Sequence, residues 1–166
     1  MREALTKMPG WICAPSPNCD VRPRGVVVDT IVVHATVLNT PQEVVRRFAD
    51  PRSGVSSHYT IDRDGSVIVH VDESLRAWHA GASRMPDGRV AANDFSIGIE
   101  LVNRNDGRDP YPQPQVDALV SLIMEVSTRH PIRYIVSHAE IAVPPGRKTD
   151  PLGLDLDSVR HRTLAR

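Results

Sequence analysis

Val26-Val27-Val28-Asp29-Thr30-Ile31-Val32-Val33-His34 is the stretch of this chain that decides its fold. Apart from Asp29 and Thr30, the residues before His34 are β-branched and apolar. Such an uninterrupted run is typical of a strand that is buried on both faces. We therefore predict a central strand from Val26 to Val33 that ends at His34.

Turn and capping signals divide the rest of the chain into further elements. Thr40-Pro41-Gln42-Glu43 combines an N-cap, a proline at the first helical position and a capping-box glutamate, so it opens a helix. Asp62-Arg63-Asp64-Gly65 contains an Asp-Gly pair, which is typical of a hairpin. Further strands are predicted over residues 56–61, 66–71, 96–102 and 134–138, and further helices over 114–129 and 154–164. This alternation predicts an α/β fold with a mixed central β-sheet flanked by helices.

Length and composition indicate a single domain. The 166 residues suit one domain of ordinary size, and 40% apolar residues supply material for one core. Residues 1–25 are predicted to form an extended N-terminal arm, because their second half is rich in proline and poor in apolar side chains. The arm is expected to pack on the domain proper, residues 26–166. Cys13 and Cys19 are expected to be two free thiols, with a local bridge between them as the alternative.

Charge and hydropathy exclude several classes of protein. Twenty Lys and Arg residues balance twenty Asp and Glu residues, so the positive field that draws proteins to nucleic acid is missing. No apolar run approaches the roughly 20 residues that span a bilayer. Residues 1–10 lack the apolar segment of a secretory signal. We expect no nucleic-acid partner, no membrane insertion, a cytoplasmic location as synthesised, and a monomer.

Two histidines directly follow predicted strands. His34 ends the valine-rich run, and His138 ends a second short apolar run. Ligand sites in open α/β sheets gather beyond the carboxyl ends of the strands, so the two side chains meet if their strands are parallel neighbours. Asp150, which the next proline biases toward an extended conformation, is a third candidate. Two imidazoles and one carboxylate suit a catalytic zinc, which leaves a position for water. A hydrogen bond to a neighbour is the ordinary alternative for each histidine.

Three other residues are candidates for chemistry, each with a structural alternative. Glu100 ends a strand core, where partial burial would raise its pKa toward that of a general base; a salt-bridged strand end is the alternative. Lys148 lies two residues before Asp150, so it is a candidate to stabilise an oxyanion on the same face; an exposed lysine is the alternative. Trp78 beside small residues fits the wall of a sugar or peptide site, and equally a core tryptophan.

These candidates lie in sequence blocks that follow one another over roughly residues 15–160. The blocks are Ser16-Pro17-Asn18-Cys19-Asp20-Val21-Arg22-Pro23, Ile31-Val32-Val33-His34, Ser56-Ser57-His58-Tyr59, Arg63-Asp64-Gly65, Ala77-Trp78-His79-Ala80-Gly81, Asn93-Asp94-Phe95-Ser96-Ile97-Gly98-Ile99-Glu100-Leu101, Ser137-His138 and Arg147-Lys148-Thr149-Asp150-Pro151. In residues and in order, the chain resembles the zinc-dependent N-acetylmuramoyl-L-alanine amidases of type 2, the group that includes AmpD and AmiD. This group is related to the peptidoglycan recognition proteins.

The resemblance implies a role for each catalytic candidate. By their positions in the blocks, His34, His138 and Asp150 correspond to the zinc ligands. Glu100 corresponds to the acid/base residue, and Lys148 to the residue that stabilises the tetrahedral intermediate. These assignments coincide with the candidates found from the pattern of strand ends.

The resemblance also implies substrate-binding candidates. Trp78, His79 and Asn93 fall in the region that faces the muropeptide in this family. His58 and His79 lie in family blocks but are not family zinc ligands, so we leave both out of the predicted metal set.

The activity implied is zinc-dependent hydrolysis of the amide between N-acetylmuramic acid and the L-alanine of peptidoglycan or muropeptides. The alternatives are a catalytically silent peptidoglycan-binding module, a zinc endopeptidase that cuts within the stem peptide, and a phage-type endolysin that reaches the wall through a holin-type pore. Retention of all the implied catalytic positions favours the enzyme. Ala91 departs from the recycling members of the group, which carry arginine there, and this bears on preference for anhydromuramoyl products.

Overall fold

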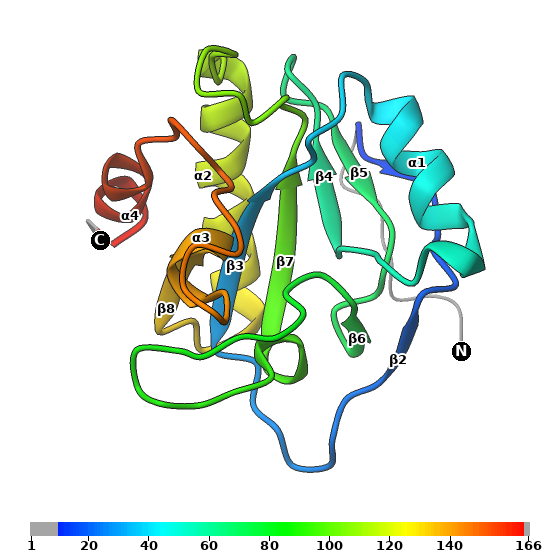
Figure 1. Cartoon of the computed structure of the whole chain (residues 1–166), viewed down its shortest axis with the longest axis vertical. Coiled ribbons are helices and arrows are strands. Elements are labelled where there is room, and N and C mark those ends of the chain that lie inside the picture. Colours follow the sequence, from blue (N-terminus) through cyan, green and yellow to red (C-terminus); the bar gives the residue numbers. More distant parts are fainter. Residues whose placement is uncertain (1–9, 165–166) are drawn as a thin grey trace.

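A six-stranded mixed sheet forms the centre of the computed structural model, which describes residues 10–164. Its strand order is β1-β5-β4-β7-β3-β8, and β2 and β6 form a separate antiparallel pair. The three neighbours β7, β3 and β8 are parallel, and β4 and β5 form the antiparallel hairpin predicted from the Asp-Gly turn (Figure 1). The strands are β1 Ile12–Cys13, β2 Cys19–Val21, β3 Thr30–Ala35, β4 Tyr59–Ile61, β5 Val67–Val69, β6 Leu75–Ala77, β7 Ser96–Leu101 and β8 Tyr134–Ser137. The predicted fold class is confirmed.

The central strand starts later than the sequence predicts. It was expected from Val26, but β3 begins at Thr30, and Val27 is 58% exposed. The register explains the difference, because Thr30 is already paired with the first residue of β7 and the first residue of β8. The valines before Asp29 therefore run past the end of both neighbouring strands and have no ladder to join.

Alternation along the central strands separates two faces of the sheet. On β3, Ile31 and Val33 join the core under helix α2, whereas Val32 belongs to a second cluster on the opposite face. On β7, Ile97 and Ile99 likewise belong to the α2 core. Successive side chains of a strand point to opposite faces, so the residues between them are directed away from α2. His34 on β3 and Glu100 on β7 therefore lie on this second face.

Local chemistry explains where helix α1 begins. The Thr40 side chain caps α1, and Glu43 completes the capping box. Helices α2 and α4 cover one face of the sheet, and α4 also fastens the edge strand β8, because the Arg160 guanidinium donates a 2.8 Å hydrogen bond to the Ile135 carbonyl (Figure 1). Within residues 10–164, no helix is long and apolar enough to cross a membrane. The helices are α1 Pro41–Ala49, α2 Gln113–Arg129, α3 His138–Ile141 and α4 Leu156–Leu164, with 3-10 turns at Pro51–Ser53 and Ala92–Asp94.

The segment predicted as an N-terminal arm contributes two short strands. β1 pairs in parallel with β5, and β2 pairs with β6, so the described part of the arm lies against the domain. Asn18 fastens it through hydrogen bonds from its side-chain amide to the carbonyl oxygens of Phe48, Asp50 and Val55. Cys13 and Cys19 are both free thiols. Residues 1–9, which include most of the segment examined for a secretory signal, lie outside the described residues.

A buried histidine makes stability depend on pH. His70 is 3% exposed, its Nδ1 lies 2.8 Å from the Ala14 carbonyl oxygen, and burial lowers its pKa to about 4. The unfolded chain binds this proton below about pH 6.5, whereas the folded chain resists it until about pH 4. We therefore expect His70 to cost about 2 kcal/mol of folding stability between pH 7 and pH 5. Urea unfolding of the wild type and of His70→Gln at pH 7 and pH 5 measures this loss of stability. An equal change in the free energy of unfolding in the two proteins would contradict the prediction.

Candidate active site

The sheet topology brings together the histidines that the sequence singled out. His34 lies in β3, and His138 is the first residue of α3, directly after β8. Because β3 and β8 are parallel neighbours, both histidines stand at the same, carboxyl end of the sheet. Their ring centroids are 4.5 Å apart.

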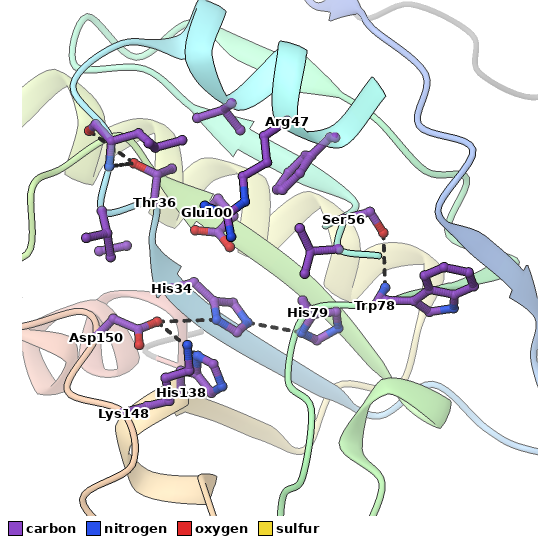
Figure 2. A pocket seen from close by; sticks show the side chains of 16 residues that line it. His34, Thr36, Arg47, Ser56, Trp78, His79, Glu100, His138, Lys148 and Asp150 are labelled. Carbon is purple, nitrogen blue, oxygen red and sulfur yellow. Dashed lines mark hydrogen bonds and ion pairs between the residues drawn. The ribbon is translucent and has the colours of Figure 1, made fainter. Parts of the chain in front are cut away.

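Asp150 completes a compact group with these two histidines (Figure 2). Its Oδ2 atom lies 3.1 Å from Nδ1 of His138 and 3.4 Å from Nδ1 of His34. One donor atom from each of the three side chains lies within 4.8 Å of the others, and all three residues are buried. Burial raises the pKa of Asp150, but hydrogen bonds from His138 and His34 in their protonated forms outweigh burial and lower that pKa well below its usual range. Burial lowers the pKa of His34 to about 4.

The positions of the imidazole protons indicate that the group of His34, His138 and Asp150 can hold a cation. Nε2 of His138 lies 3.0 Å from the Ala80 carbonyl oxygen, which only accepts, so a neutral His138 carries its proton on Nε2. Its Nδ1 then presents a lone pair to the Asp150 carboxylate, and two acceptors face each other at 3.1 Å. A cation among the three side chains turns this repulsion into attraction. Two imidazole nitrogens and a carboxylate oxygen form the donor set of a metal site with an open position.

Glu100 stands next to this group on β7. It is the register partner of His34, and its side chain lies on the same face of the sheet (Figure 2). Burial raises its pKa to about 8, Asp150 adds to the rise, and the charge of Lys148 opposes it. Its Oε2 atom is buried and has no hydrogen-bond partner among the described residues. A carboxyl group without a partner, with a pKa near neutrality, is suited to accepting and returning a proton.

The group opens into a pocket of about 290 Å³. Lys148, exposed at its rim, lines this pocket with Trp78 and His79. Asn93, a predicted substrate-binding residue, is not among the pocket's lining residues; its side-chain oxygen accepts hydrogen bonds from the backbone N–H groups of His79 and Ala80.

Sequence reasoning missed Arg47, which also lines the pocket. It extends from α1 toward Glu100, and its charge lowers the pKa of that carboxyl group (Figure 2). Helical spacing contains the signal that would have found it. Arg47 follows Val44 by three residues, so both lie on the face of α1 that lines the pocket.

An α/β sheet with two histidines and an unpartnered glutamate at the carboxyl ends of its strands, and with a loop aspartate beside the histidines, defines a metal-dependent hydrolase. The chain belongs to the N-acetylmuramoyl-L-alanine amidase family, because the model of that family matches residues 24–153. This match confirms the resemblance seen in the sequence blocks.

Individual relatives agree with the family match. The chain is 35% identical over 181 residues to the 1,6-anhydro-N-acetylmuramyl-L-alanine amidase AmpD of Citrobacter freundii, covering 93% of this chain and 92% of AmpD. A crystal structure of a selenomethionine derivative of AmpD matches with a TM-score of 0.81 and 31% identity, covering 94% of this chain and 96% of that one. AmiD of Escherichia coli, solved with anhydro-N-acetylmuramic acid-L-Ala-D-gamma-Glu-L-Lys, matches with a TM-score of 0.72 and 28% identity, covering 85% of this chain and 60% of AmiD.

Proposed function

We propose that this chain is a zinc-dependent amidase that hydrolyses the bond between N-acetylmuramic acid and the L-alanine of muropeptides. The observation that carries the proposal is the pairing, in one pocket, of a three-donor metal group with the unpartnered carboxyl of Glu100. The activities named for AmpD and for the AmiD substrate complex support the choice of bond.

The proposed zinc would be held by Nδ1 of His34, Nδ1 of His138 and the Asp150 carboxylate. When bound, zinc supplies a Lewis acid that polarises a carbonyl group and acidifies water. Each histidine nitrogen that points away from Asp150 has a protein partner, so both rings are held in the orientation that metal binding requires.

Glu100 and Lys148 perform the remaining steps. The Glu100 carboxylate takes a proton from the attacking water while the oxygen of that water bonds to the scissile carbonyl carbon. The nearby Lys148 ammonium offsets the negative charge that develops on the carbonyl oxygen. Glu100 then returns the proton to the departing nitrogen of L-alanine as the C–N bond breaks. The products are a lactyl carboxylate on the muramic acid and a peptide with a free amino terminus.

A defined substrate separates this activity from its rivals. We expect zinc-loaded protein to release intact tripeptide from a muramoyl-tripeptide, and a strong chelator to stop the release, as measured by mass spectrometry of the products. Shortened peptides would indicate an endopeptidase instead. No cleavage of this substrate or of intact peptidoglycan by folded, zinc-loaded protein would leave a binding module. The recycling and endolysin alternatives differ in where the enzyme acts, and the cytoplasmic location and monomeric state stay predictions.

A further inference from the structure

Two consecutive residues, His79 and Ala80, contact the outer nitrogens of both proposed metal ligands. Nδ1 of His79 lies 3.0 Å from Nε2 of His34, and the carbonyl oxygen of Ala80 lies 3.0 Å from Nε2 of His138. In the same segment, Trp78 lines the pocket. One short stretch of chain therefore meets the two rings on the side that faces away from Asp150.

The hydrogen bonds around His79 fix the direction in which its protons point. The Ser96 hydroxyl donates to the Ala92 carbonyl oxygen at 2.6 Å, so toward Nε2 of His79, 3.3 Å away, it offers only an acceptor. His79 therefore carries its proton on Nε2 and presents a lone pair at Nδ1. That lone pair accepts from Nε2–H of His34 and leaves Nδ1 of His34 unprotonated toward Asp150.

The segment is itself held in place from two sides. The Asn93 side-chain oxygen accepts the N–H groups of His79 and Ala80 at 3.2 and 2.8 Å. The His79 ring also fills the space over Gly98, where a Cβ atom would lie 2.6 Å from the ring carbons. The His79 ring therefore packs directly against the backbone of Gly98.

We infer that His79 and Asn93 are positioning residues of the metal site, which act by fixing the tautomers of its two histidine ligands. His79 holds the proton of His34 on Nε2 directly, and Asn93 places the Ala80 carbonyl that does the same for His138. This inference rests on the metal site of the proposed function, and it gives both residues a task other than the substrate binding expected from the sequence. Both His79 ring nitrogens already have partners within the protein, which leaves neither free for a substrate.

The test compares two substitutions at each position. His79→Leu removes the acceptor for His34, whereas His79→Asn can place an amide oxygen near the position of Nδ1. Asn93→Leu removes the acceptor for the segment, whereas Asn93→Asp keeps an oxygen there. The readouts are the dissociation constant for Zn²⁺ alone, from competition with a chromophoric chelator, and the imidazole tautomers in long-range ¹H–¹⁵N spectra.

We expect His79→Leu and Asn93→Leu to bind Zn²⁺ about 10- to 100-fold more weakly, the range for loss of an outer partner of a ligand. In the spectra they should lose the Nε2–H signal of His34 or of His138, respectively, while His79→Asn and Asn93→Asp stay close to the wild type. A His79→Leu protein with wild-type affinity and spectra would overturn the inference, as would a His79→Asn protein that binds Zn²⁺ as weakly as His79→Leu does. Wild-type protein that binds Zn²⁺ without cleaving muropeptide would contradict the proposed function alone, because affinity and tautomer are read without substrate.

Discussion

His34→Ala is expected to abolish both zinc binding and amide cleavage. The substitution removes one of three donors from a buried group, and it leaves the Asp150 carboxylate with a single histidine neighbour. Loss of a ligand should exceed the 10- to 100-fold effect of losing an outer partner, so we expect zinc affinity to fall by more than about 100-fold. The zinc content of dialysed protein and the rate of tripeptide release measure the two effects.

His161→Ala is the matched control for this experiment. His161 is exposed on α4, so its loss should change neither zinc content nor rate. A folded His34→Ala protein that keeps stoichiometric zinc would exclude His34 as a ligand, and full activity in that protein would remove the proposed site altogether.

Glu100→Gln is expected to retain zinc and to slow hydrolysis by about 10²-fold or more, as loss of a general base does. Glutamine keeps the shape of the side chain but cannot take a proton from water. The effect on hydrolysis is expected without an effect on zinc binding, because Glu100 lies outside the three-donor group. Single-turnover rates at equal zinc occupancy measure the effect, and Glu125→Gln, a surface residue paired with Arg129, is the control.

Two results for Glu100→Gln would contradict its proposed role. Normal turnover by zinc-loaded Glu100→Gln would show that another group takes the proton, and the buried carboxyl would then need a structural explanation. Reduced zinc content in this variant would instead make Glu100 part of the metal site.

That His34 and His138 come together could be predicted, because the signals lie in two short segments of the sequence. His34 and His138 each follow an apolar run, and parallel strands place such residues at one edge of the sheet. The capping box at Thr40 was equally readable, since each of its hydrogen bonds spans three residues. The start of β3 could not be predicted, because a run of valines does not indicate where the neighbouring strands begin.

The tasks of His79 and Asn93 lay beyond the sequence for a different reason. A histidine in a family block looks the same whether it faces a substrate or another histidine. Only the fold shows that Ser96, from the next strand along the chain, contacts one ring nitrogen and that Gly98 lies beneath the ring. Arg47 was missed because an arginine on an amphipathic helix usually faces solvent, whereas here it lies with Val44 on the face that lines the pocket.

Both edges of the described central sheet are poorly suited to recruiting another chain. At one edge β1 is only two residues long, and at the other the Arg160 guanidinium occupies the Ile135 carbonyl of β8. Amyloid-like growth and strand exchange require a long, free ladder of N–H and C=O groups, which short or covered edge strands do not offer. The short strand β1, which pairs with β5, therefore leaves no long ladder at this edge for a second chain to join.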